Sequence, residues 1–507
     1  MTIAPSHTCG GHSFSRTARF SFQDGLLMKN SLIVLVALLC PAFSALAGGQ
    51  ASHTSPMSGQ IYVTHVAIVD TVRGTETRDQ TVIITNDRIS SVGGSKSIKP
   101  PADARVIDGA GKYLIPGLWD MHVHAVDAER LDNMFPMFVA NGVLGIRDMG
   151  TAMPLADIER LRQEIASGSR LGPRFVAAGP LLDGRPKPFR ANFLAITTPE
   201  QGRATVDSLK ADGADFIKVY SWLSRDTFFA IAGETSKVKI PFVGHVPFSV
   251  PALEASDAGM KSMEHLHGIV LACSAREDEL RSEMLKAGVN LSRDARLRLE
   301  LDEAAASYDD SKAAPIFAHL AKNQTWQVPT LVIRVPYARS FDTRITTDPR
   351  LKYVPPSVQQ RWTEEAKSST DGATMAKTFE KLSQIVGEMQ RAGVPILAGT
   401  DASWYQLYTY AGFSLHDELG LLVRAGLTPA QALRSATIDP ERFLGRDKDL
   451  GSIEIGKLAD LVLLDADPLS DISNTKKINT VIVSGRVLDR KALDSLLASA
   501  ERDVMNK

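Results

Sequence analysis

The stretch LIPGLWDMHVH at residues 114–124 is an apolar run that ends in two histidines, and it is the first of eight such runs. Near-continuous apolar strands that alternate with helices indicate a parallel sheet covered on both faces, and eight of them favour closure into a barrel. We therefore expect an α/β protein in which residues 116–445 form a (β/α)8 TIM barrel, with functional residues at the carboxyl ends of its strands. The other runs are GVLGIRDM (142–149), RFVAAG (174–179), DFIKVY (215–220), PFVGHV (241–246), SMEHL (262–266), WQVPTL (326–331) and VPILAGTD (394–401).

Two segments that flank this region predict a smaller β-structure. Residues 58–115 contain β-branched runs such as IYVTHVAIVD, separated by Gly, Asn and Asp turn signals. Residues 446–490 return to strand-like runs, ADLVLLDADP and TVIVSGRVLDR. We expect the two segments to pair into one small β-sandwich beside the barrel. Residues 491–507 are expected to form a C-terminal helix or tail.

The composition is typical of a soluble globular protein, since 44% of the 507 residues are hydrophobic and 23% are charged. The formal net charge is −1, which leaves no basic excess to neutralise phosphates. Nucleic acid is therefore not expected as a partner, whereas a small-molecule substrate is expected.

The first 47 residues are read as a lead followed by a secretory signal peptide. Residues 29–47, KNSLIVLVALLCPAFSALA, combine a positive start, a short apolar run and an Ala-x-Ala end at Ala47. A transmembrane anchor is the alternative, but the apolar run is shorter than the roughly 20 residues that a bilayer requires. We expect a periplasmic or secreted protein with no membrane association after signal removal. Cleavage would leave Cys273 as the one remaining cysteine, so the mature chain would have no internal disulfide.

Metal-ligating side chains recur at the ends of the predicted strands. His122 and His124 are two residues apart at the end of the first strand, so both side chains point to the same face. A barrel brings the ends of its strands together in one mouth, where further donors would join this pair. Taken together they look like a ligand set. These further donors are Lys218, His245, His265 and Asp401.

The motifs PGLWDMHVH, GADFIKVY, VGHV, SMEHLHG and AGTD, in this order, resemble those of the amidohydrolase superfamily of metal-dependent hydrolases. Within it, the chain is most similar to the imidazolonepropionase-like and prolidase-like exported group, and the resemblance runs from Ile61 to Arg486. It implies a site with two divalent metal ions, for which zinc is the default. Family members are often oligomers, so a homo-oligomer is one expected form.

The same resemblance implies a role for each residue. His122 and His124 would bind the more buried metal, and His245 and His265 the more exposed one. Asp401 would bind the first metal and move protons. Lys218 would be carboxylated by carbon dioxide and bridge the two metals.

Elementary electrostatics supports the role implied for Lys218, because an ammonium repels cations whereas a carbamate is an anionic bridge with two oxygens. The alternatives are a structural ion pair and a site with a single metal in which Lys218 takes no part. His267 departs from the simpler Glu-His-Gly pattern expected of the family. It is either an outer-sphere donor, an alternative ligand or a surface residue.

With metals bound, a shared water would become the nucleophile and the substrate carbonyl would be polarised. Asp401 would take the proton of this water and pass it to the leaving amine. Tyr220 lies two residues past Lys218 on the same strand face, so it could stabilise the oxyanion or bind substrate. A tyrosine of the core is an equal alternative.

The leading function is hydrolysis of a peptide-like C–N bond in a dipeptide or an N-acyl amino acid. The second hypothesis is ring-opening of a cyclic amide or lactone, and the third is that the chain is a non-catalytic binding protein on the same scaffold. Arginines in the long connection after Thr330 could hold a substrate carboxylate, which would favour the peptide reading. The sequence does not say which arginine does so. The candidates in that connection include Arg334, Arg339 and Arg344.

Overall fold

The computed structural model describes residues 59–188, 190–338, 343–368 and 372–505. The predicted lead and signal, residues 1–47, lie outside this part of the chain. The described residues form an α/β fold with three sheets. None of their helices is long and apolar enough to cross a membrane. Cys273 is buried and forms no disulfide with another described residue.

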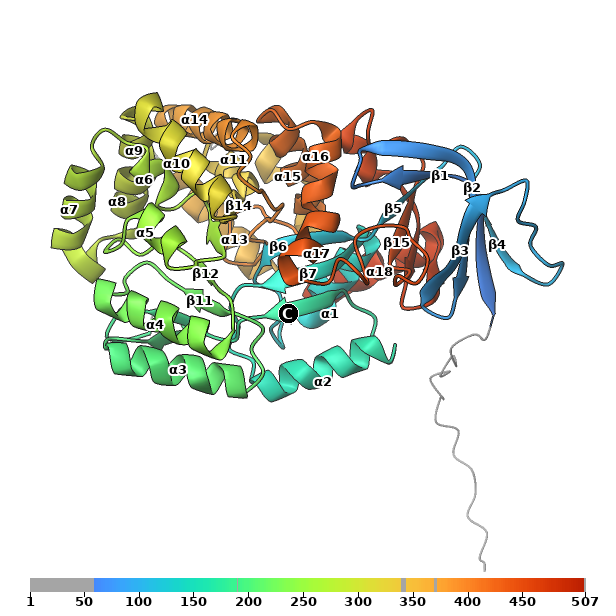
Figure 1. The fold of residues 1–507 in the computed structure, drawn as a ribbon, viewed down its shortest axis with the longest axis horizontal. Coiled ribbons are helices and arrows are strands. Elements are labelled where there is room, and N and C mark those ends of the chain that lie inside the picture. Colours follow the sequence, from blue (N-terminus) through green and yellow to red (C-terminus); the bar gives the residue numbers. More distant parts are fainter. Residues whose placement is uncertain (1–58, 189, 339–342, 369–371, 506–507) are drawn as a thin grey trace, which may run out of the picture. The chain divides into compact units, whose positions relative to one another are not determined.

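Segments from both ends of the chain build one eight-stranded sheet, drawn in blue and red in Figure 1. β5 pairs with the C-terminal β15 in antiparallel fashion, with Leu114 opposite Leu463. The predicted pairing of the two segments is therefore present, while their packing as a two-layered sandwich stays a prediction. The strands are β1 (Gln60–Asp70), β2 (Thr75–Thr85), β3 (Arg88–Gly94), β4 (Arg105–Asp108), β5 (Tyr113–Pro116), β15 (Leu461–Leu464), β16 (Ile478–Val483) and β17 (Arg486–Leu488).

The region between these segments holds two parallel sheets, β6-β7-β8 and β10-β9-β11-β12-β13-β14. Seven of the eight predicted runs contain a strand of these sheets. The eighth, residues 394–401, has no assigned strand, but parallel bridges join Ile396 to Gln327 and Ala402 to Val123. The strands are β6 (Leu118–Val123), β7 (Val143–Asp148), β8 (Arg174–Ala177), β9 (Leu181–Asp183), β10 (Phe193–Ala195), β11 (Ile217–Val219), β12 (Phe242–Gly244), β13 (Ser262–Glu264) and β14 (Trp326–Val328).

Helices follow most of these strands, and Figure 1 shows them arranged around β6, β7, β11 and β12. Helix α3 begins with a capping box between Thr198 and Gln201, and α16 begins with another between Thr428 and Gln431. The helices of the first half are α1 (Leu131–Ala140), α2 (Leu155–Ala166), α3 (Pro199–Ala211), α4 (Arg225–Val238), α5 (Ala252–Asp257) and α6 (Ile269–Ala272).

The second half contains longer helical connections after β13 and β14. A π-helix, η2 (Arg298–Glu303), lies within the first of them, and such turns are frequent at functional sites. The remaining helices are α7 (Glu277–Ala287), α8 (Arg293–Leu297), α9 (Ala304–Ala306), α10 (Asp310–Lys322), α11 (Val335–Ala338), α12 (Thr343–Thr346), α13 (Pro356–Ser368), α14 (Gly372–Arg391), α15 (Phe413–Arg424), α17 (Ile438–Leu444) and α18 (Arg490–Met505), with α16 at Pro429–Ser435. The short 3-10 helices are η1 (Gly288–Asn290), η3 (Leu331–Arg334), η4 (Pro349–Tyr353) and η5 (Ile472–Lys476).

An apolar cluster is drawn from the parallel strands and the residues next to them. Its members come from strands that are far apart in the sequence, so their burial holds the ends of these strands together. They include Trp119, Met121, Met149, Val176, Phe216, Val243, Val328 and Leu397.

Candidate metal centre

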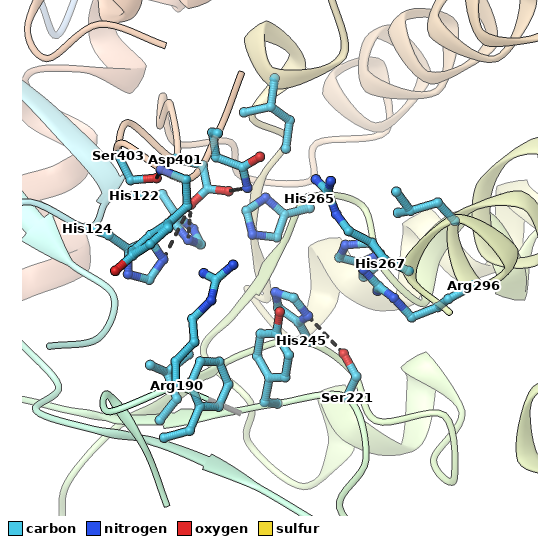
Figure 2. Close-up of a pocket in the computed structure, with 18 of the residues that line it drawn as sticks. His122, His124, Arg190, Ser221, His245, His265, His267, Arg296, Asp401 and Ser403 are labelled. Carbon is cyan, nitrogen blue, oxygen red and sulfur yellow. Dashed lines mark hydrogen bonds and ion pairs between the residues drawn. The ribbon is translucent and has the colours of Figure 1, made fainter. Parts of the chain in front are cut away.

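The strand ends bring the predicted site residues to one cavity of about 580 Å³, shown in Figure 2. His122 is on β6 and Lys218 is on β11, while His245 and His265 directly follow β12 and β13. His124, Tyr220 and Asp401 line the same cavity. Residues from five separate parts of the sequence thus meet at one place.

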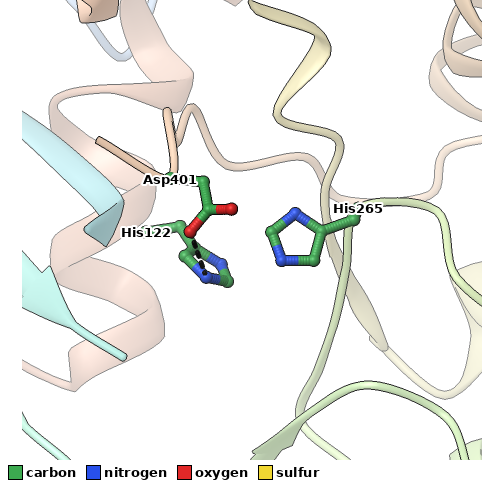
Figure 3. A group of neighbouring side chains, drawn as sticks. All are labelled: His122, His265 and Asp401. Atoms are coloured by element: carbon green, nitrogen blue, oxygen red, sulfur yellow. Dashed lines mark ion pairs between the residues drawn. The ribbon is translucent and has the colours of Figure 1, made fainter. Parts of the chain in front are cut away.

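His122, His265 and Asp401 form the tightest group, with one potential ligand atom of each within 4.8 Å of the others (Figure 3). Asp401 Oδ1 lies 3.5 Å from His122 Nε2 and 3.4 Å from His124 Nε2. Burial alone would raise the pKa of Asp401, but His124, His122 and Lys218 outweigh it and lower this pKa to about 2. Asp401 is therefore an anion at neutral pH.

All four predicted histidine ligands are anchored through Nδ1. His122 Nδ1 lies 2.7 Å from Glu264 Oε2, and His124 Nδ1 lies 3.1 Å from the carbonyl oxygen of Gly150. Because carboxylates and carbonyls only accept, both rings donate from Nδ1, which in the neutral tautomer leaves the lone pair on Nε2. The other two anchors are hydroxyl groups, Ser221 Oγ at 3.0 Å from His245 and Thr330 Oγ1 at 2.7 Å from His265.

His122 Nε2 is buried and has no hydrogen-bond partner among the described residues. A buried polar atom without a partner is costly, and a metal ion would satisfy it. Metal-bound histidines usually donate their other ring nitrogen to a carboxylate or carbonyl, as His122 and His124 do. The histidine and carboxylate set therefore fits a divalent metal.

Glu264 is fully buried and connects His122 to a buried arginine. It accepts hydrogen bonds from Arg147 Nη2 at 3.0 Å and from Ser262 Oγ at 2.6 Å. Burial would raise the pKa of Glu264, but Arg147 and His122 outweigh this effect and lower it to about 2. The carboxylate that orients His122 is thus held as an anion.

Lys218 is 1% exposed and makes no hydrogen bond or ion pair with any residue that the structure describes. Burial lowers its pKa to about 8, so a sizeable fraction of the amine is neutral near this pH. A neutral amine is the form that reacts with carbon dioxide. A buried ammonium, by contrast, normally has an anionic partner.

Several residues at the site have left-handed backbone conformations that are uncommon outside glycine. The φ angles are 55° for Asp401, 60° for His265 and 48° for Thr330. Such conformations cost energy and cluster at functional sites, where the surrounding fold holds them. Close packing also requires a glycine at position 399, because a Cβ at Gly399 would lie only 2.9 Å from His122 Cβ.

Tyr220 and His267 complete the wall beside His245. The Tyr220 ring lies 4.1 Å from the His245 ring, and burial raises the pKa of Tyr220. The His267 ring lies 4.8 Å from that of His245, and its Nδ1 lies 2.9 Å from Glu300 Oε2. The hypothesis that His267 is a surface residue is wrong, because the residue is only 3% exposed and lines the cavity.

The sequence reasoning missed Glu264 and Arg147 as supports of His122. The sequence does carry a signal for Glu264, because an acidic residue in the strand-like run SMEHL, directly before His265, is unusual and indicates a buried partner. It also missed arginines of the cavity, because Arg185, Arg190, Arg296 and Arg361 lie in loops and helices with no strand-end pattern. In the connection after Thr330, Arg339 and the side chain of Arg344 lie outside the described residues.

The sequence model of the amidohydrolase family matches residues 113–488. The chain is 25% identical over 203 residues to 5-methylthioadenosine/S-adenosylhomocysteine deaminase of Thermoanaerobacter pseudethanolicus, and this match covers 37% of this chain and 43% of the deaminase. It is 33% identical over 108 residues to imidazolonepropionase of Shouchella clausii, and this match covers 20% of this chain and 23% of the imidazolonepropionase. The chain thus spans less than half of the length of either curated relative.

A solved structure, described as a putative prolidase from Bifidobacterium longum, covers much more of the chain. It matches with a TM-score of 0.62 and 25% sequence identity, over 88% of this chain and 100% of the other.

Proposed function

Because the chain belongs to the amidohydrolase family, whose members are hydrolases acting on C–N bonds, we propose that it is a metal-dependent hydrolase of dipeptides or N-acyl amino acids. The observation that carries this proposal is the set of four histidines. Each is anchored through Nδ1 at a strand end, and all four line one cavity together with Asp401.

We propose that the strands of the two parallel sheets close into the (β/α)8 barrel of residues 116–445. The bridges from residues 394–402 to β14 and β6 support this closure, because they link the last predicted run to the seventh and to the first. The two flanking segments, residues 58–115 and 446–490, would then form the β-sandwich beside it.

The metal-binding roles are proposed residue by residue. His122, His124 and Asp401 would hold one ion and His245 and His265 the other, with zinc as the expected metal and a carbamate on Lys218 as the bridge. Bound ions would supply an activated water and polarise the substrate carbonyl.

The protein groups supply proton transfer and positioning. Asp401 is ionised at neutral pH, so it can take a proton from water and return it to the leaving amine. Gln406 donates a hydrogen bond to Asp401 Oδ2, while Oδ1 faces His122 and His124. Tyr220 lines the cavity beside His245, where its hydroxyl could hold the oxyanion or the substrate.

The amide of a dipeptide or N-acyl amino acid is favoured over a cyclic amide by two observations. The cavity is lined by six arginines, which suits a substrate with a free carboxylate. The structure matched at 25% identity is described as a putative prolidase. The relative named imidazolonepropionase supports ring-opening as the second candidate, over a much shorter match.

The predicted signal at residues 29–47 supports a proposed periplasmic or secreted location. There the enzyme would act on small molecules, with no nucleic acid or membrane partner.

The test is release of free amino acid from a panel of dipeptides, N-acyl amino acids and cyclic amides, measured before and after chelation. We expect chelator-sensitive hydrolysis of linear substrates. Hydrolysis of the cyclic substrates alone would replace this proposal with the ring-opening reading, and no turnover of any substrate with added zinc would favour the binding-protein reading.

A further inference from the structure

Arginines surround the candidate metal centre, and most of them already have acidic or carbonyl partners. Arg293 Nη1 lies 2.5 Å from Glu365 Oε1, and Arg296 Nη1 lies 3.0 Å from Glu300 Oε2. Arg361 donates to the carbonyl oxygen of Trp404. The six arginines that line the cavity are Arg185, Arg190, Arg293, Arg296, Arg334 and Arg361.

Arg334 is different from the arginines beside it. It is half-buried on the cavity wall and makes no hydrogen bond or ion pair with any residue in the described part of the chain. Burial, together with the nearby cations of Arg293 and Arg296, lowers its pKa to about 10. A half-buried guanidinium next to two others is stabilised by an incoming anion.

The backbone that carries Arg334 is tied directly to the candidate metal centre. Thr330 holds His265 through a 2.7 Å hydrogen bond, and η3 (Leu331–Arg334) starts at the next residue. A 3-10 helix rises about 2 Å per residue, so Arg334 lies about 8 Å along the chain from Thr330. The turn that orients a predicted ligand therefore also carries the arginine.

A buried carboxylate fixes this short helix from behind. Glu418 is fully buried on α15 and accepts hydrogen bonds from the backbone N–H groups of Leu331, at 3.0 Å, and Val332, at 2.7 Å. These are donors at the start of η3 that have no partner within the helix. Arg334 is thus held on a fixed support, as a binding residue requires.

Arg296 and Glu300 extend the same wall toward His267. Glu300 is 1% exposed and lies 2.9 Å from His267 Nδ1, so its charge is shared between a histidine and an arginine. Two acidic residues, Glu300 and Glu365, neighbour three arginines on this wall: Arg293, Arg296 and Arg334. Three positive charges against two negative charges leave one positive charge in excess. Figure 2 shows Arg296 beside His267, on the opposite side of the cavity from His122 and Asp401.

We propose that Arg334, supported by Arg296, binds the α-carboxylate of the substrate, and that the enzyme therefore prefers amides whose amino-acid part carries a free α-carboxylate. This inference rests on the proposed function. It places the substrate carboxylate on the part of the cavity wall that is formed by Arg334, after β14, and Arg296, in the connection before β14. The α-carboxylate and a side-chain carboxylate have the same chemistry, so the experiment must separate them.

The test is calorimetric binding of N-methanesulfonyl amino acids, which lack a hydrolysable amide, to the full-length mature protein. Leucine and glutamate derivatives are compared as the free acid and as the α-carboxamide, and the glutamate α-carboxamide keeps its side-chain carboxylate. We expect the free acid to bind at least about 10-fold more tightly than the carboxamide, the range of charge-assisted hydrogen bonds. In Arg334→Met we expect affinity for the acid to fall about 10- to 100-fold, with affinity for the leucine carboxamide unchanged.

Arg185→Met and Arg190→Met are the matched controls, since both arginines line the same cavity. Arg334→Lys should restore part of the preference, because it returns a positive charge without the planar fork. Loss of the acid preference in a control variant but not in Arg334→Met would overturn the assignment, as would equal binding of acid and carboxamide by the wild type. If the glutamate α-carboxamide binds as tightly as the diacid, the subsite takes a side-chain carboxylate, and the α-carboxylate assignment is overturned.

Binding needs no turnover, so the two proposals fail separately. Selective binding without hydrolysis of any substrate would overturn the proposed function and retain the anion subsite. Hydrolysis without acid preference would do the reverse.

Discussion

His122 donates a hydrogen bond from Nδ1 to Glu264 across 2.7 Å, although 142 positions separate the two residues in the sequence. The bond joins β6 to β13 at full burial and leaves His122 Nε2 facing Asp401. A carboxylate in this position fixes the tautomer and orientation of a metal-binding imidazole and raises its basicity.

Replacing this carboxylate tests its role in orienting His122. Glu264→Gln should lower metal affinity about 10- to 100-fold, the range seen for outer-sphere partners of metal-bound histidines. It should also destabilise the fold by about 3–5 kcal/mol, because Arg147 would lose its buried anion. Competition with a metal chelator and denaturant unfolding measure the two effects. Glu254→Gln, at an exposed pair with Arg225, is the control, and equal metal affinity in both variants would contradict the account.

Lys218 is predicted to carry a carbamate that bridges two metals. Lys218→Ala should therefore lose at least one bound ion and most activity, and labelled bicarbonate should give a carbamate signal in the carbon NMR spectrum of the wild type only. A wild-type protein that keeps its metal and activity after exhaustive removal of carbon dioxide would instead favour the reading in which Lys218 takes no part.

Asp401 is predicted to transfer protons. Asp401→Asn should lower kcat about 100- to 10,000-fold, the contribution typical of a general acid–base group. Gln406→Met, which removes the hydrogen bond to Oδ2 but keeps the carboxylate, should have a much smaller effect. The comparison is made under saturating metal, so that the loss of a ligand is separated from the loss of proton transfer. Comparable rates for the two variants would exclude the proposed role.

His416 gives a prediction on stability that is independent of the metal centre. Its ring is buried between Thr475 Oγ1, at 2.9 Å, and the carbonyl oxygen of Asn141, at 3.0 Å. Burial lowers the pKa of His416 from 6.5 to about 4 in the folded state. The unfolded chain therefore takes up a proton first, and stability falls as the pH drops from 6.5 to about 4, by about 3 kcal/mol in total.

His416→Gln should flatten this pH dependence, as measured by denaturant unfolding between pH 7 and pH 4, conditions that bracket the shift. His319→Gln, at a partly exposed ion pair with Asp257, serves as the control. An unchanged slope in His416→Gln would show that other groups cause the acid sensitivity.

The alternation of apolar runs predicted most of the parallel strands, because burial on both faces leaves a continuous apolar pattern in sequence. It missed β9 and β10, whose residues LLD and FLA are isolated apolar stretches separated by the polar segment GRPKPFRAN. The meeting of His122, Lys218 and His265 was predictable, since parallel strands bring their carboxyl ends to one edge. The wall formed by Arg296 and Arg334 was not, because long helical connections follow no period that relates them to the strands.

Metal content per mature chain, measured together with hydrolysis of N-acyl amino acids before and after chelation, is the decisive test of a hydrolase with two metal ions. We expect about two divalent ions per chain, loss of hydrolysis when they are removed and recovery when zinc is returned. Hydrolysis that persists in the metal-free protein would contradict this expectation.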